Sequence, residues 1–169
     1  MSGEVSSTSP VLRTRFATTA QQHLRILKQY KRLAMVGLSA NPYRPSHFVA
    51  LYIRAAGYQI FPVNPREREI LGCPCYATLA EVPPPLEIVD IFRESSAVPA
   101  IVEEAIAAGA KVIWMQLGVI HEQAAARALE AGLEVVMDRC IKIEHARFFG
   151  GLSTMGLNAG VLSARKPGN

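Results

Sequence analysis

The sequence predicts an α/β fold built on a doubly wound, five-stranded parallel sheet with helices on both faces. Five short runs of continuously apolar residues are separated by segments in which apolar residues recur at helical spacing. Strands that are apolar on both faces belong to a parallel sheet that helices cover on both sides. The first run, residues 33–36, leads through a turn of Gly, Ser, Asn and Pro into a helix. A strand, a turn and a helix in this order are the repeating unit of such a sheet.

A helix from about residue 18 to residue 30 is expected before the first strand. Thr18 or Thr19 can serve as its N-cap, and Gln21 or Gln22, three residues further on, completes a capping box. Its apolar side chains recur at helical spacing at Ala20, Leu24 and Leu27. This helix is expected to pack on the edge or on a face of the sheet.

The turn after the first strand predicts a phosphate site. A helix start supplies unpaired backbone N–H groups and about half a positive charge from its dipole. Small turn residues let an anionic ligand approach the backbone. The turn contains Gly37, Ser39, Ala40, Asn41 and Pro42, and the helix begins at Ser46. Along that helix one apolar face is formed by Phe48, Leu51, Tyr52 and Ala55.

The rest of the chain repeats the alternation of strand and helix. Glycines stop the predicted helices at Gly57, Gly109 and Gly132. The predicted strands are residues 58–63, 87–92, 111–116 and 133–137, and the later helices are residues 99–108 and 121–131. Trp114 and Met115 lie inside a strand and are expected in the core.

Right-handed crossovers predict the strand order 3-2-1-4-5 for this sheet. The ligand crevice then lies at the carboxyl ends of the first and fourth strands, where the winding changes direction. Polar or small residues follow each apolar strand, as a binding edge requires.

The composition favours one domain with a small anionic ligand. The chain has 169 residues, of which 50% are hydrophobic and 19% charged, and a formal net charge of +4. A nucleic-acid surface needs clustered Lys and Arg, and a membrane span needs roughly 20 consecutive apolar residues. The sequence has neither, so we expect no nucleic-acid or membrane partner and a cytoplasmic location.

The three cysteines are too few, and odd in number, for a disulfide framework. Cys73-Pro74-Cys75 is one residue short of the usual metal or redox spacing. An ordinary loop is therefore expected at this pair.

The end of the second strand narrows the choice of nucleotide. Sites for unphosphorylated NAD usually carry an acidic residue there, whereas this chain has Asn64-Pro65 followed by Arg66 and Arg68. Two guanidinium groups favour a phosphorylated ribose, which both NADP and coenzyme A (CoA) contain. Only one glycine of the dinucleotide fingerprint is present, at Gly37. The four histidines are scattered and form no nucleophile-base pattern, and no substrate domain follows residue 148, which favours CoA.

Long runs of the sequence resemble the family of stand-alone CoA-binding domains. The runs are VGLSANPYRPSHFVALYIRAAGYQIFPVNP, LAEVPPPLEIVDIFRESSAVP and AIAAGAKVIWMQLGVIHEQAAARALEAGLEVVMDRCIKIE, within roughly residues 30–148. The combination of VDIFR, WMQLGV and VMDRC is the most specific part. The family's fold is similar to the N-terminal domain of the succinyl-CoA synthetase α-subunit, so the resemblance implies a Rossmann-like domain that binds CoA or an acyl-CoA. It implies no reaction, because the synthetase keeps its phosphorylated histidine in a second domain.

The resemblance also implies where each part of CoA binds. The pyrophosphate is expected on the loop from Gly37 to Pro42 and on the helix start at Ser46. The adenosine is expected along Val63, Asn64 and Pro65, with Arg66 or Arg68 near the 3′-phosphate, where the synthetase-like pattern has a lysine. The pantetheine arm is expected to pass Phe92, Arg93 and Ser95 and to run toward Gln116, Leu117, Gly118 and Cys140.

Simpler roles exist for several of these residues. Ser39, Asn41 and Ser46 could serve only as turn and cap residues. Arg93 could form a surface ion pair with Glu94 or Asp138, and Gln116 and Gly118 could have no ligand role. Cys140, between Arg139 and Lys142, could lie close to the CoA sulfur or be an inert buried thiol.

The predicted organisation is a disordered tail at residues 1–15, a CoA-binding domain with its leading helix at residues 16–148, and a Gly-rich tail at residues 149–169. The predicted function is binding of CoA or an acyl-CoA without catalytic residues of its own. Two alternatives are a small NADP-dependent oxidoreductase and a subunit of a CoA ligase that needs a partner chain. The leading helix and the tail could also support a homodimer.

Overall fold

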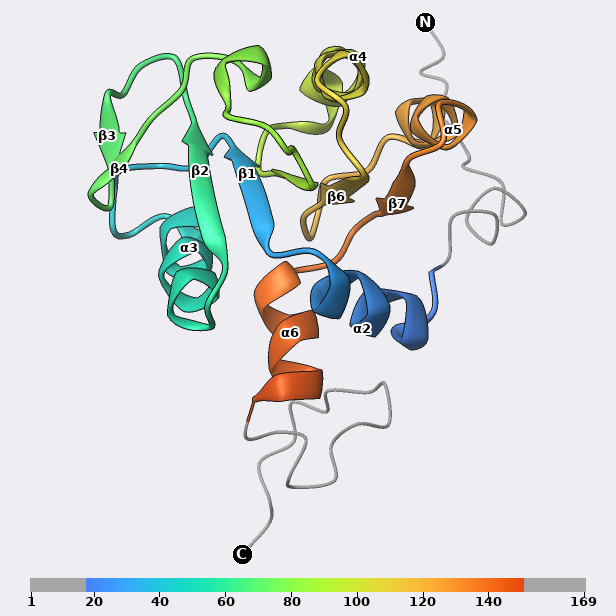
Figure 1. Ribbon diagram of the computed structural model, residues 1–169, viewed down its shortest axis with the longest axis horizontal. Helices are drawn as coiled ribbons and strands as arrows, with labels where there is room; N and C mark the ends of the chain where they lie inside the picture. Colours follow the sequence, from blue (N-terminus) through green and yellow to red (C-terminus); the bar gives the residue numbers. More distant parts are fainter. Residues whose placement is uncertain (1–17, 151–169) are drawn as a thin grey trace, which may run out of the picture.

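Five parallel strands form the central sheet, in the order β2-β1-β5-β6-β7 (Figure 1). The strands are β1 (Arg32–Val36), β2 (Gln59–Val63), β5 (Ile88–Ile91), β6 (Val112–Met115) and β7 (Glu134–Val136). These come from a computed structural model that describes residues 18–150. Each strand lies within two residues of its predicted range at both ends, and the doubly wound parallel α/β fold is confirmed.

One feature of the predicted topology requires correction, namely the place of the third strand. The order 3-2-1-4-5 put it outside the second strand, whereas β5 lies between β1 and β6 and pairs with both. Both arrangements are compatible with an apolar strand and a right-handed crossover, so the local pattern does not distinguish them. The winding therefore changes direction between β1 and β5. The position at which open sheets of this kind bind ligands is then between the ends of the first and third strands, instead of the first and fourth.

Five helices cover the two faces of this sheet. They are α2 (Ala20–Gln29), α3 (Pro45–Ala55), α4 (Val98–Ala107), α5 (Glu122–Glu130) and α6 (Ile141–Phe149). In Figure 1, α2, α3 and α6 lie below the strands and α4 and α5 lie above them. The crossover from β2 to β5 is formed by a short hairpin and the 3-10 turn η1 (Leu79–Glu81), and a second 3-10 turn, η2 (Ser95–Ala97), precedes α4.

The alternation of side chains along each strand divides the core into two layers. On β1, Leu33 and Met35 face the cluster formed with α2, α3 and α6, whereas Ala34 and Val36 face the cluster formed with α4 and α5. Trp114 and Met115 follow the same alternation on β6, and both are fully buried, as predicted. The sheet is thus apolar on both faces because both faces are covered.

The leading helix has the predicted cap but a different buried face. Thr19 is the N-cap of α2 and forms the capping box with Gln22. The side chains that α2 buries are His23, Ile26 and Leu27, whereas Ala20 is exposed. Of the three predicted apolar positions, Leu27 is buried, Leu24 is half-buried and Ala20 is exposed, and the prediction left out the buried His23 and Ile26.

The structure also corrects the apolar face that was predicted for α3. The residues of α3 that pack on the sheet are Val49, Ala50 and Ile53. Phe48 is 55% exposed, on another side of the helix. The helix is apolar on more than one face, so its spacing alone does not identify the buried one.

The segment around the cysteine pair forms a hairpin instead of an ordinary loop. Strands β3 (Glu69–Ile70) and β4 (Cys73–Pro74) pair antiparallel across the turn at Leu71 and Gly72. Both turn residues have positive φ, 55° and 73°, which is typical of two-residue hairpin turns. Cys73 and Cys75 are free thiols on this hairpin and its exit.

The predicted tails fall almost entirely outside the described part of the chain. Residues 1–17 and 151–169 are not described, so the predicted disorder at residues 1–15 lies outside it. Phe149, assigned to the C-terminal tail, belongs to α6. Among residues 18–150, no helix is long and apolar enough to cross a membrane.

Candidate functional site

The loops that follow β1 and β5 meet at the point where the winding of the sheet changes direction. Gly37 ends β1 with φ of 85°, and its N–H donates to Val63 O at 3.0 Å. A Cβ built at Gly37 would lie 3.0 Å from Arg93 Cδ, so the arginine side chain lies directly against this glycine. A glycine is needed here by its backbone conformation as well as by the approach of Arg93. The two predicted residues Gly37 and Arg93 are therefore brought together.

Hydrogen bonds within the loop after β1 hold it in shape. The Ser39 N–H donates to Ser46 Oγ at 3.1 Å, and the Asn41 N–H donates to Ser39 Oγ at 3.1 Å. The Tyr43 N–H donates to Asn41 Oδ1 at 3.0 Å. These three side chains therefore act as turn residues, the simpler of their two predicted roles. They hold the backbone of the loop in its shape.

The helix start at this loop differs slightly from the prediction. Helix α3 begins at Pro45, its N-cap Arg44 makes no side-chain cap, and Ser46 is a buried residue of the first turn. The N–H groups of Leu38, Ala40 and Ser46 donate to no acceptor within residues 18–150. Unpaired N–H groups at a strand-to-helix turn are donors that an anion can accept from.

The end of β2 is tied to this loop by Asn64. Its Nδ2 donates to Leu38 O at 3.1 Å, and its Oδ1 accepts from the Arg66 N–H at 2.9 Å. Pro65, Arg66 and Arg68 are exposed. Neither of these two guanidinium groups has a hydrogen bond or ion pair within the described part of the chain. They are thus exposed cations that follow Asn64 in the chain, available to an anionic ligand.

The loop after β5 carries a mixture of apolar and polar side chains. Phe92 is half-buried against the layer of α2, α3 and α6. The Arg93 Nη2 donates to Glu94 Oε1 at 3.1 Å, and both side chains are largely exposed. Hydrogen bonds, first from the backbone of Glu94 and then from Arg93, lower the pKa of the Glu94 carboxyl. Ser95 Oγ accepts from the Ile120 N–H at 3.0 Å, which joins this loop to the one after β6.

The residues predicted at the ends of β6 and β7 occupy different environments. Leu117 is 66% exposed, and the N–H of Gly118 donates to Asp138 Oδ1 at 2.7 Å. Gln116 is buried, and its side chain points away from solvent. Cys140 is a half-buried free thiol at the N-cap of α6, without a side-chain cap bond.

Gln116 bonds to a residue that sequence reasoning passed over. Its Nε2 donates to Asp90 Oδ1 at 2.6 Å, and Asp90 is fully buried on β5. Burial raises the pKa of the Asp90 carboxyl to about 8, against the opposing effect of the Gln116 hydrogen bond. A single acidic residue in the middle of the apolar run from residue 88 to residue 92 is the signal that could have identified it.

A second buried polar cluster also escaped the sequence analysis. His23 Nδ1 lies 2.9 Å from Glu144 Oε2, and Arg147 Nη1 donates to the same oxygen at 3.2 Å. Burial opposes ionisation of Glu144, but the hydrogen bond and charge of His23, with Arg147 and Arg139, hold its pKa below the usual range. The pair joins α2 to α6, far along the sequence, which is why spacing could not show it.

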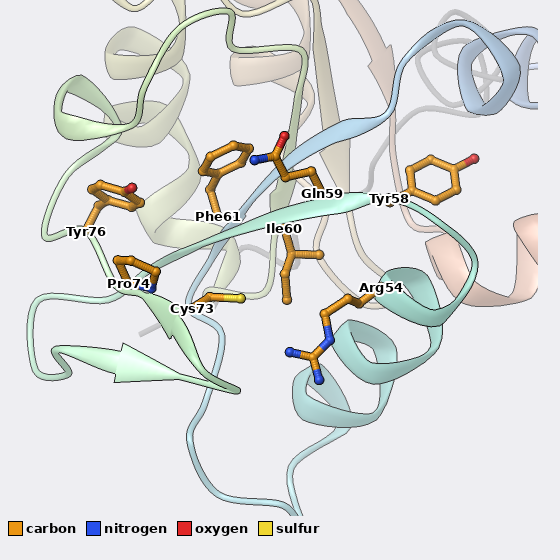
Figure 2. A pocket seen from close by; sticks show the side chains of 8 residues that line it. All are labelled: Arg54, Tyr58, Gln59, Ile60, Phe61, Cys73, Pro74 and Tyr76. Atoms are coloured by element: carbon orange, nitrogen blue, oxygen red, sulfur yellow. The ribbon is translucent and has the colours of Figure 1, made fainter.

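The structure also contains a groove away from the loops that follow β1 and β5, along the outer edge of β2 (Figure 2). It measures about 350 Å³ and lies between the end of α3 and the β3–β4 hairpin. Its lining residues are Arg54, Tyr58, Gln59, Ile60, Phe61, Cys73, Pro74 and Tyr76. Arg54 Nη1 donates a hydrogen bond to Leu71 O. None of the predicted site residues lines this groove.

Similar proteins agree with the fold and with the predicted ligand class. The chain matches the family described as CoA binding domain over residues 31–146. It is 44% identical over 121 residues to the protein YneT of Bacillus subtilis, spanning 72% of this chain and 90% of that protein. It is 31% identical over 74 residues to the ADP-forming acetate–CoA ligase I of Archaeoglobus fulgidus, a region that makes up 44% of this chain and only 11% of the ligase.

Solved structures repeat the same architecture. A hypothetical protein from Pyrococcus horikoshii OT3 is 38% identical, with a TM-score of 0.78 over 85% of this chain and 99% of that one. An acetyl-coenzyme A synthetase of Ca. Korarchaeum cryptofilum is 21% identical, with a TM-score of 0.57 over 64% of this chain and 26% of that one, and shows the fold alone. From the match over residues 31–146, the chain belongs to the CoA binding domain family.

Proposed function

We propose that this protein binds CoA or an acyl-CoA in the crevice between the ends of β1 and β5, as a binding module without a catalytic set of its own. The observation that carries the proposal is the juxtaposition of the β1 loop with Arg93 at the point where the winding changes direction. Ligands of open α/β sheets bind at this point. The family match supports CoA as the ligand and lends no support to the NADP alternative.

The pyrophosphate is proposed to lie on the loop from Gly37 to Pro42 and on the first turn of α3. The unpaired N–H groups of Leu38, Ala40 and Ser46 supply hydrogen-bond donors there. The N-terminal end of the α3 dipole adds a favourable field for a negative charge. Asn41 and Ser39 keep the loop open by bonding to backbone N–H groups inside it.

The adenosine 3′-phosphate is proposed to lie beside Arg66 or Arg68. Both side chains are exposed next to Asn64, which binds the β1 loop through Leu38 O. An arginine can form two parallel hydrogen bonds with a phosphate, and here no carboxylate of the described chain competes for either guanidinium. Val63, Asn64 and Pro65 would form the wall beside the adenosine.

The pantetheine arm is proposed to run across the ends of β5 and β6. Phe92, Arg93 and Ser95 lie on the first of these loops, and Gln116, Leu117 and Gly118 on the second. The hydrogen bond from Ile120 N–H to Ser95 Oγ joins the two loops. Cys140, at the start of α6, is the candidate residue near the thiol end.

A second candidate function is that of a subunit in a CoA ligase with a partner chain. It is favoured by the match to the acetate–CoA ligase, in which the similar region is 11% of the whole protein. The larger remainder of that ligase has no counterpart in the match. A partner that supplies a nucleotide-dependent activity would distinguish this function from stand-alone binding.

Calorimetric titration with CoA, acetyl-CoA, dephospho-CoA and NADP, each at matched concentration, tests the proposal. We expect binding of CoA and acetyl-CoA, weaker binding of dephospho-CoA by roughly tenfold, and none of NADP. Arg66→Gln with Arg68→Gln should weaken CoA to the level of dephospho-CoA and leave dephospho-CoA unchanged. Arg25→Gln removes one exposed positive charge, on α2, that pairs with Glu134 of β7, and serves as the control for a change of charge away from the site. Binding of NADP in preference to CoA would refute the proposal.

A further inference from the structure

Asp90 is a buried acid with one oxygen left without a partner. It lies on the central strand β5, between Met35 of β1 and Trp114 of β6, and its side chain is fully buried. Gln116 Nε2 donates to Oδ1, whereas Oδ2 has no hydrogen-bond partner. A buried polar group of this kind is costly, and an apolar side chain would fill the same place in the strand at lower cost. A functional role for Asp90 would explain why an acid is found at this costly position.

Gln116, the partner of Asp90, is the residue that shapes the turn after β6. Its own N–H donates to Ile91 O at 3.2 Å, and its C=O accepts from the Val119 N–H at 2.8 Å. With the 2.6 Å bond to Asp90, the main chain and the side chain of Gln116 are both held. The position of this turn thus depends on a side-chain bond to the middle of the sheet.

The same turn is connected to the neighbouring loops of the crevice. The Gly118 N–H donates to Asp138 Oδ1 at 2.7 Å, and the Ile120 N–H donates to Ser95 Oγ at 3.0 Å. Gly118 has φ of 84°, a conformation that a non-glycine residue rarely adopts. Leu117, which precedes these two bonds in the turn, is 66% exposed.

We propose that Asp90 is a positioning residue for the thiol end of the CoA site, which it orders by holding Gln116 and the turn from Gln116 to Ile120. This inference rests on the proposed binding of CoA and adds to it a residue that does not touch the ligand. The carboxyl acts in its neutral form. A carboxylic acid can accept from Gln116 without leaving a net charge inside the sheet.

The surroundings of Asp90 support the neutral form. Burial raises its pKa to about 8, and no charged group contributes to that shift. The titratable groups that α2 and α6 bury in this layer are His23, which packs 5.7 Å from the ring of Trp114, and Glu144, which pairs with His23 and Arg147. Helix α6 also buries His145, which bonds to Tyr52 of α3. Strand β1 contributes Met35 beside Asp90, and β6 contributes Trp114 and Gln116. None of these partners supplies a cation to Asp90.

Two variants and two ligands test the proposal in the full chain. Asp90→Asn keeps an acceptor for Gln116 and mimics the neutral acid, whereas Asp90→Val removes the acceptor. Adenosine 3′,5′-bisphosphate is the control ligand, because it lacks the pantetheine arm that reaches the turn. At pH 7 we expect Asp90→Val to weaken CoA by about tenfold and the bisphosphate by less than twofold. Asp90→Asn should bind both ligands within twofold of the wild type.

A titration series from pH 6 to pH 9 supplies the second readout. The affinity of the wild type for CoA, divided by that of Asp90→Asn, should fall several-fold above pH 8, because a buried carboxylate forces the turn to rearrange. Taking the ratio of the two affinities cancels any pH dependence that comes from the titration of CoA itself. If Asp90→Val does not fold, this ratio decides alone.

Equal weakening of both ligands by Asp90→Val, or a ratio that stays constant with pH, would overturn the positioning role. The proposed function fails in a different way, since the wild type itself would then bind neither CoA nor the bisphosphate at millimolar concentration.

Discussion

Replacing Asp90 by Asn should change how the stability of the protein depends on pH. Asp90 has an ordinary pKa of 3.8, and burial raises it to about 8 in the folded protein. Between these values the folded state keeps a proton that the unfolded chain has lost. The favourable contribution is therefore complete below about pH 4 and is lost as the pH rises toward 8. The wild type should become less stable throughout this window.

The magnitude follows from the width of the window. Each pH unit within it costs about 1.4 kcal/mol of unfolding free energy. From pH 5 to pH 7.5 the wild type should thus lose about 3 kcal/mol more than Asp90→Asn, whose side chain is neutral at every pH. The free energy of unfolding of a typical domain is about 5–15 kcal/mol, and we expect a value in this range for this protein. A loss of about 3 kcal/mol is a large part of it.

Urea unfolding of both proteins at several pH values between 5 and 7.5 is the assay. The fluorescence of Trp114, the single tryptophan, reports on unfolding because its side chain is fully buried. The difference between variant and wild type isolates Asp90 from the other titrating groups. A difference that stays constant within about 0.5 kcal/mol over this range would refute the reasoning, because it would mean that Asp90 is ionised in the folded protein.

Three further substitutions test other parts of the structure. Gly37→Ala should destabilise the protein by about 1–2 kcal/mol in urea unfolding, because of the positive φ and the contact with Arg93, and should weaken CoA in a titration; unchanged values of both would contradict it. Glu144→Gln should cost about 3 kcal/mol by the same assay, because it breaks the buried pair with His23. The exposed control Glu103→Gln should cost less than about 0.5 kcal/mol, and equal costs would argue against the buried pair. Ser46→Ala should cost about 1 kcal/mol and speed hydrogen exchange at the Ser39 amide, which loses its acceptor; slow exchange in the variant would exclude that bond.

The predicted site could be read from the sequence only in part. The loop from Gly37 to Pro42 and the end of β2 at Asn64 do lie side by side, joined by the bond from Asn64 to Leu38 O. Gln116, predicted on the ligand path, has its side chain turned inward to Asp90 instead. The alternation along β6 places Gln116 on the same face as Trp114, and its hydrogen bond depends on Asp90 of the neighbouring strand, which lies 26 residues earlier in the chain.

The sequence by itself determined the five strands of the sheet and the helices α2 to α5, with ends within two residues of the predicted ones. These elements and the Thr19 capping box follow from apolar periodicity and capping residues, which act over a few neighbouring positions. Tertiary structure decided the position of β5 beside β1, the buried face of α3, and the meeting of His23 with Glu144. Each of these depends on residues far apart in the chain, and each is selected by which surfaces pack best together. Local patterns carry no information about that choice.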